Sequence, residues 1–385
     1  ILILLVLLSI IIRIPVILKF GDARLDNEWL ILINNLKDHG TLSLVGDWFT
    51  PSLEDFNGYL LPNLWMPPLY AYYIYFFTFF NLEEQNYILL ILLSQAFLAS
   101  ITIIIFYKIN KLFFSDITSL FTSIIFSIFP LYVYASSQIS TTSLHTFLLM
   151  IFYYNFFRIA EKENFLSIFL FSFTAGLIML TRYGEHVVIF LFSSFYLFFF
   201  FKVPIKKILL IFIIALITIS PYLTRNILIF DKLTINKSLG FNLWKGNNIN
   251  SDVEGSFLLD DNLKEKIDKI PKDKFYRLKF DKIFLDEAII NIRKDPKEYL
   301  VLFLKKATSF FFINTKSSQS NYYHPINILS LLLLALSSLI GIILSSKKSY
   351  KLSYIFFILL ILIIIYSCFF ILPRYKLTII PLQMI

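Results

Sequence analysis

Three carboxylates lie close together after the first apolar run of the chain, at Asp22, Asp26 and Glu28. A carboxylate in a cleft can accept a proton as a general base. The structural alternative is that these side chains begin the next helix, with Asp26 as the N-cap and the charges complementing the helix dipole. Both interpretations stay open for Asp22 and Glu28, and we favour the catalytic one for Asp26.

Three arginines lie at the ends of apolar runs, at Arg182, Arg225 and Arg374. A single arginine at a membrane boundary is explained by its long side chain reaching the interface. Three at equivalent depth, each beside an aromatic residue or a proline, instead predict an anionic ligand. A phosphate fits best, because a guanidinium group offers paired donors to its oxygens, and Lys376 would add a further positive charge.

The remaining polar residues give no sign of a metal, a disulfide or a nucleotide site. The four histidines are scattered and lack ligand spacing, which predicts hydrogen-bonded structural residues at His39, His145, His186 and His324. A single cysteine, Cys368, excludes an intramolecular disulfide. The chain contains no P-loop or dinucleotide-binding glycine pattern.

The amino-acid composition indicates whether the chain lies in water or in a membrane. Hydrophobic residues make up 57% of the 385 positions and charged residues 16%, with a mean hydropathy of +0.73. A soluble core of this length could not bury so much apolar surface, so the sequence predicts an all-α polytopic membrane protein. The net charge of +9 does not indicate nucleic acid, because the basic residues mostly sit in short clusters between apolar runs.

About ten apolar runs are long enough to be spanning helices. We place them at 2–19, 87–107, 113–134, 143–159, 164–180, 185–202, 207–224, 325–345, 352–372, and from about 376 onward, where the sequence cuts the last one short. Four short connectors between them are basic, at 108–111, 158–162, 202–207 and 347–351. Positive charge marks cytoplasmic loops, so the opposite, extracytoplasmic face of the cell membrane receives the long polar segments 20–86 and 225–324.

These boundaries divide the chain into three parts: a membrane module over 1–224 that includes the outer loop 20–86, an outer insertion over 225–324, and C-terminal spanning helices over 325–385. Within the outer loop, residues 26–37 carry Trp29, Leu32, Ile33 and Leu36 at helical spacing, which predicts a helix along the interface. The aromatic run 71–80 is too short to span and predicts a juxtamembrane helix. Residues 275–293 predict a charged helix in the insertion.

Several motifs in this order resemble one family of membrane enzymes. They are the acidic segment after the first run, Pro67-Pro68-Leu69-Tyr70, Gly176-Leu177 leading to Leu180-Thr181-Arg182, Pro221–Asn226, Gly240–Asn247, and Arg374-Tyr375-Lys376. The sequence resembles the GT-C superfamily of polytopic glycosyltransferases, in the branch of protein O-mannosyltransferases and lipid A aminoarabinose transferases. The resemblance spans nearly the whole chain.

This resemblance implies an inverting transfer of a sugar from a polyprenyl-phosphate or dolichyl-phosphate carrier to a hydroxyl of a lipid, glycan or protein acceptor outside the cytoplasm. The family's acidic motif matches Asp26 with Trp29, and Asp22 remains a rival base. The arginines and Lys376 would hold the donor phosphate. Candidates for the substrate pocket are Trp29, Pro67, Pro68, Tyr70, Glu185, His186 and Trp244.

The chain departs from the family pattern at two places. Met66 replaces a basic or His residue that often precedes the double proline, and the 136–142 loop lacks a common carboxylate. The second change weakens the case for a divalent metal, and no cofactor is otherwise indicated. Two alternatives stay open: a ligase or polymerase of lipid-linked oligosaccharides, and a transporter or lipid flippase, which would place charges near mid-membrane.

Overall fold

The structure is a computed structural model that describes the chain except residues 1, 47–49, 315, 320–321, 323 and 345–348. Its helices are α1 (Leu2–Phe20), α2 (Asn27–His39), α3 (Leu69–Thr78), α4 (Glu84–Asn110), α5 (Asp116–Ile128), α6 (Pro130–Ala135), α7 (Thr142–Glu161), α8 (Phe165–Met179), α9 (Gly184–Phe199), α10 (Ile205–Phe230), α11 (Leu239–Asn247), α12 (Asp261–Asp268), α13 (Tyr276–Lys294), α14 (Pro296–Phe311), α15 (Pro325–Leu344), α16 (Tyr350–Cys368), the 3₁₀ helix η2 (Pro373–Thr378) and α17 (Ile380–Gln383). No β-strand occurs in the described part, so the all-α prediction is confirmed.

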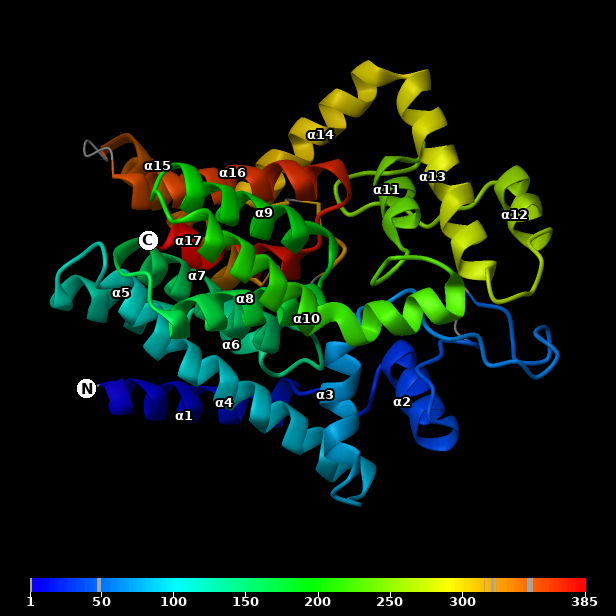
Figure 1. Ribbon diagram of the computed structural model, residues 1–385, viewed down its shortest axis with the longest axis horizontal. Helices are drawn as coiled ribbons and strands as arrows, with labels where there is room; N and C mark the ends of the chain where they lie inside the picture. The colour runs from blue at the N-terminus through cyan, green and yellow to red at the C-terminus, as the bar shows by residue number, and fades with distance from the viewer. Residues whose placement is uncertain (1, 47–49, 315, 320–321, 323, 345–348) are drawn as a thin grey trace.

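The long apolar helices pack side by side into a bundle, and the polar segments gather at one end of it (Figure 1). Helix α7 lies between α4 and α8, α8 packs on α10, and α1 packs on α4. Aromatic rings fill the centre, where the rings of Phe156 and Tyr354 stack with centroids 3.7 Å apart. The backbone polar groups of each helix form hydrogen bonds within that helix, so contacts between side chains, such as these rings, hold the helices together.

Within the residues that the structure describes, five helices are long and apolar enough to cross a membrane: α1, α4, α10, α15 and α16. Shorter apolar helices, α5, α8 and α9, occupy other predicted spans. The predicted span 113–134 is broken at Phe129-Pro130, because proline cannot continue the hydrogen-bond ladder of α5. The predicted last span also differs: η2 and the four-residue α17 fold into the bundle, largely buried.

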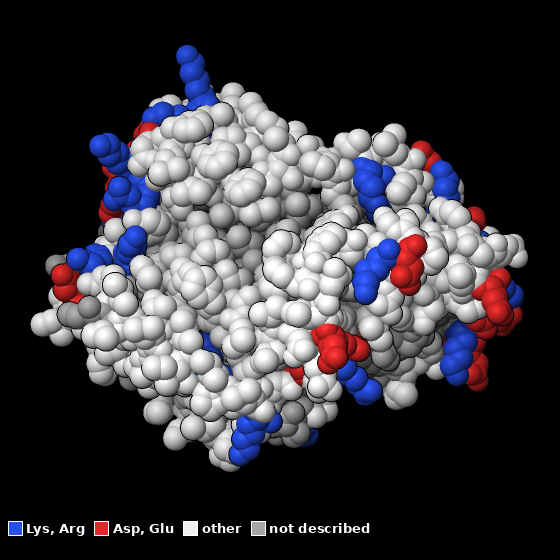
Figure 2. All heavy atoms as spheres, turned by 90° about the horizontal axis from the view of Figure 1, so that it is seen from below, with Lys and Arg blue, Asp and Glu red and all other residues white. Residues whose placement is uncertain are grey.

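Most charged residues lie toward the two ends of the long axis of the molecule, with an uncharged surface between them. Figure 2 shows a broad uncharged surface, with Lys and Arg and a few acidic residues at one edge and mixed charges at the other. At the first edge, Lys351 pairs with Glu161 and Lys207 with Glu163, which brings three of the basic connectors together. An uncharged band between two charged ends is what a membrane-spanning bundle requires.

The polar end contains the two helices predicted in the outer loop and a compact insertion. The predicted interfacial helix is α2 and the predicted juxtamembrane helix is α3. The predicted charged helix is α13, and it packs against α11 so tightly that a Cβ on Gly240 would lie 2.0 Å from the carbonyl oxygen of Asp281. Helices α12 and α14 were not expected from the sequence.

Candidate functional site

The turn between α8 and α9 carries Arg182 to the polar end of the bundle. The backbone N–H of Leu69, at the start of α3, donates to the carbonyl oxygen of Leu180 at 2.9 Å. This bond joins the double-proline motif to the turn. The Arg182 Nε donates to the hydroxyl of Thr141 at 3.2 Å, and the guanidinium group lies over the Tyr375 ring at 5.7 Å.

Arg374 approaches the same ring from the C-terminal segment. Its guanidinium carbon lies 5.9 Å from the centre of the Tyr375 ring. Two of the three predicted arginines therefore meet around one aromatic side chain, although one follows α8 and the other begins η2. Proline at position 373 opens η2 and sets the backbone direction that turns Arg374 outward.

A cavity of about 290 Å³ lies beside Arg374. Its walls come from the insertion and from the start of η2, and they include Lys245, Glu254, Phe257, Tyr322, Pro373 and Arg374. Burial raises the pKa of the Tyr322 hydroxyl to about 12, and the charges of Arg374, Asp22 and Arg182 also act on it. Tyr322 thus lies where the influence of the two arginines and of a carboxylate overlaps.

The acidic segment borders this region, with its members in different environments. Asp22 is half-buried, and one carboxylate oxygen accepts from the Ile139 N–H at 2.6 Å. Burial raises the pKa of Asp22 and the negative charge of Asp26 adds to the rise, while the Ile139 hydrogen bond opposes it. Asp26 is exposed at the N-cap of α2 and makes no capping hydrogen bond with its side chain. Glu28 is half-buried, and its charge acts on Lys245.

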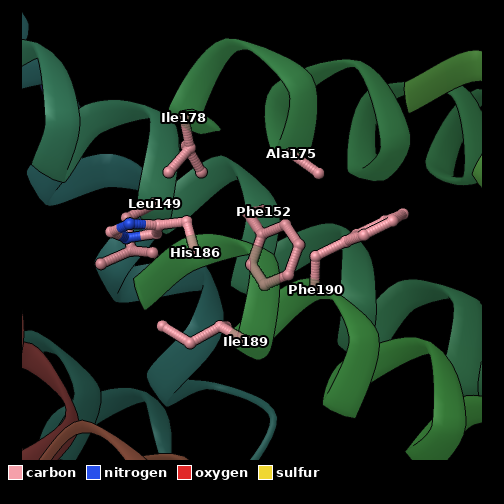
Figure 3. A pocket seen from close by; sticks show the side chains of 7 residues that line it. All are labelled: Leu149, Phe152, Ala175, Ile178, His186, Ile189 and Phe190. Carbon is pink, nitrogen blue, oxygen red and sulfur yellow. The ribbon is translucent and has the colours of Figure 1, made fainter. Parts of the chain in front are cut away.

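Glu185 and His186, at the start of α9, belong to a buried network behind the arginines. The Tyr366 hydroxyl donates to Glu185 at 2.8 Å, and the Nε2 atoms of His186 and His145 lie 2.9 Å apart. Figure 3 shows His186 among apolar side chains of α7, α8 and α9, next to a cavity of about 10 Å³, room for about one water molecule. The pairing of His145 with His186 corrects the expectation that the histidines are scattered.

Other predicted site residues lie elsewhere. Arg225 donates to the carbonyl oxygen of Asn63 at 2.8 Å and to Asn226 at 2.6 Å, so it fastens α10 to the outer loop. Lys376 is 1% exposed and donates to the carbonyl oxygen of Phe312. Within the described part of the chain, neither side chain lies over the Tyr375 ring, where Arg182 and Arg374 meet. Both cations satisfy backbone carbonyls instead.

The aromatic candidates are mostly core residues. Trp29 packs edge-on against Tyr70 with ring centres 4.9 Å apart, and the Tyr70 hydroxyl donates to Gln95. Trp244 packs on Phe284 at 4.7 Å inside the insertion. Pro68 is buried as the N-cap of α3, and Pro67 before it is half-buried.

Sequence reasoning missed three residues of this region: Lys245, Glu254 and Tyr322. Lys245 lies inside the Gly240–Asn247 motif, which was a usable signal, but a lysine in a polar insertion is normally a surface residue. Glu254 and Tyr322 stand in segments without a pattern. Among the described residues, no group of three or more His, Cys, Asp or Glu side chains is arranged to hold a metal ion.

Part of the membrane module matches a known protein family. No curated protein matches the chain. Residues 66–224, from the double-proline motif through α10 as far as Thr224, match the family described as dolichyl-phosphate-mannose-protein mannosyltransferase. These residues are thus similar to a family of membrane glycosyltransferases within the GT-C superfamily, and the resemblance predicted from the sequence is confirmed over residues 66–224.

Proposed function

We propose that this protein is an inverting glycosyltransferase that takes a sugar from a polyprenyl-phosphate or dolichyl-phosphate carrier. The acceptor is a hydroxyl group of a lipid, glycan or protein on the extracytoplasmic face. The observation that carries the proposal is the meeting of Arg182 and Arg374 at Tyr375, beside a cavity lined by Tyr322, on which the charges of both arginines and of Asp22 act. The family match supports the same class of donor.

The chemistry needs one base and a site for a departing anion. The acceptor oxygen attacks the anomeric carbon, the bond from that carbon to the phosphate oxygen breaks, and the acceptor proton passes to a carboxylate. The leaving group is a phosphomonoester, whose second pKa is about 6, so it needs positive charge more than a proton. Arg182 and Arg374 supply that charge.

The acidic segment supplies the base. Asp26 is our first candidate, since its exposed carboxylate is free of a capping hydrogen bond and can meet an acceptor that arrives from the outer side. One oxygen of Asp22 is engaged by the Ile139 N–H, which suits a residue that shapes the site. Asp22 remains the rival, because its charge acts on Tyr322, on which both arginines also act.

The test incubates membranes containing the protein with a panel of labelled polyprenyl-phosphate sugars and measures transfer. Asp26→Asn should lower the rate about 10²- to 10⁴-fold, the usual effect of removing a general base. Asp38→Asn, an exposed change near the other end of α2, is the matched control and should leave the rate unchanged.

Full activity in Asp26→Asn together with loss in Asp22→Asn would move the base to Asp22. Absence of transfer from every phosphate-linked sugar would refute the proposal. Transfer only from a diphosphate-linked oligosaccharide would instead establish the ligase or polymerase alternative.

A further inference from the structure

Lys245 is fixed on the cavity wall by its own backbone. Its carbonyl oxygen accepts from the Ser256 N–H at 2.9 Å and from the Ser251 hydroxyl at 2.8 Å. Gly255 lies against the same carbonyl with φ at +77°, and a Cβ there would lie 2.7 Å from that oxygen. The loop 251–256 therefore holds the C-terminal half of α11 in one position. The backbone of Lys245 is fixed, unlike that of a lysine on a mobile surface segment.

The Lys245 side chain is then held between two aromatic rings. Its Nζ lies 3.8 Å from the centre of the Phe257 ring and 4.0 Å from that of Phe370, and the residue is only 7% exposed. Two rings offer a cation favourable contacts but no lone pair. Over the described residues, the ammonium group has no hydrogen-bond acceptor and no ion pair. Burying an ammonium group without a polar partner costs free energy, and a bound anion would offset that cost.

Arg374, which is exposed, lines the same cavity. Its guanidinium group contacts the Tyr375 ring, and the described part of the chain gives it no hydrogen bond or carboxylate partner. The positive charge of Arg374 acts on Lys245 and, after burial, is the next cause that lowers the pKa of Lys245 to about 8. Two like charges are thus held near one hollow, which favours an anion between them.

Glu254, the carboxylate among the described residues of the cavity wall, is already engaged. It accepts from the N–H of Ser318 at 3.0 Å and its hydroxyl at 2.7 Å, from the Ser317 hydroxyl, and from Asn314. These bonds fasten the loop before α15 over the cavity. Glu254 therefore fixes the cavity wall, and its charge also acts on Lys245, although the two side chains form no ion pair.

We propose that Lys245 and Arg374 together bind the phosphate group of the lipid-linked sugar donor, with Lys245 as a specificity-determining residue for that phosphate. The inference rests on the proposed function, because it names the part of the donor that this cavity receives. The two cations approach from separate segments, α11 and the start of η2. Charge-assisted hydrogen bonds from both would hold a phosphate more firmly than either alone.

The experiment measures binding separately from transfer. Purified protein in detergent micelles is titrated with farnesyl phosphate, and farnesol is the probe that lacks the phosphate. Lys245→Met should weaken farnesyl phosphate binding about ten- to a hundredfold, the range expected for a lost charge-assisted hydrogen bond. Lys245→Arg should recover most of the affinity. Lys269→Met, an exposed lysine on the insertion paired with Glu265, is the matched control and should bind as the wild type does.

Binding of farnesol should be equally weak in every variant. Unchanged farnesyl phosphate affinity in Lys245→Met, with wild-type transfer activity present, would overturn this inference and leave the proposed function standing. Lys245-dependent binding without sugar transfer would support the phosphate site while refuting the transferase. Equal affinity for inorganic phosphate would overturn the assignment to a lipid phosphate.

Discussion

Gly246 is the position where a single methyl group should damage the candidate site. It lies in the last turn of α11, pressed against the backbone of Phe369. A Cβ there would lie 2.0 Å from the Phe369 carbonyl oxygen and 3.1 Å from its Cα. Because Cβ contacts under 3.0 Å essentially never occur, Gly246→Ala forces one of the two backbones to move by about 1 Å.

The expected cost follows from two opposing effects. Overpacking of a tight contact costs about 1–3 kcal/mol. Replacing glycine by alanine inside a helix returns up to about 1 kcal/mol. A contact of 2.0 Å with backbone lies at the upper end of the overpacking range, so we expect Gly246→Ala to lower the free energy of unfolding by about 2 kcal/mol. Because Lys245 precedes the displaced residue, the KM for the donor should also rise.

The assay is SDS titration in mixed micelles, followed by circular dichroism, together with donor kinetics. Gly341→Ala is the matched control, since Gly341 lies in α15 with nothing within 4 Å of a built Cβ. That variant should be as stable as the wild type or more stable, with unchanged kinetics. Equal behaviour of the two variants would refute the close-contact reasoning.

Three further predictions follow from named contacts. Arg13→Met removes the donor to the Ser127 carbonyl oxygen at the end of α5 and should cost about 1–3 kcal/mol in the same titration; no loss would contradict this role. Arg225→Met should lower stability and leave the KM for the donor unchanged, whereas Arg374→Met should raise that KM; the reverse pattern would show that the site was placed at the wrong arginine. Binding of farnesyl phosphate should fall as pH rises past about 8, where free Lys245 loses its proton, and Lys245→Arg should flatten this dependence; a flat wild-type profile would exclude the lysine. The charged groups that act on Lys245 are Arg374, Glu254 and Glu28.

Arg13 shows where sequence reasoning stopped. A charge inside the first apolar run had no explanation in the sequence. In the structure it is 1% exposed and donates to Ser9 on its own helix and to the Ser127 carbonyl oxygen of α5. Helix ends leave carbonyls without partners, and here one of them accepts from the guanidinium group. The residue is a structural link between helices.

The sequence by itself determined the class of protein and most of its helices. Local sequence patterns predict the long apolar helices, the interfacial helix α2 and the aromatic helix α3. Such patterns suffice because the hydrophobicity of neighbouring residues decides whether a segment lies in lipid or in water. The acidic segment and the family resemblance were also readable in this way.

Only the tertiary structure decided which cations share a site. Arg182, Arg225 and Arg374 look equivalent in sequence, yet Arg225 turns to Asn63 while the other two meet at Tyr375. Lys245 lines the cavity, whereas Lys376 donates to the Phe312 carbonyl oxygen. The direction of a side chain depends on how its helix is rotated and what packs against it, and contacts between segments distant in sequence set both.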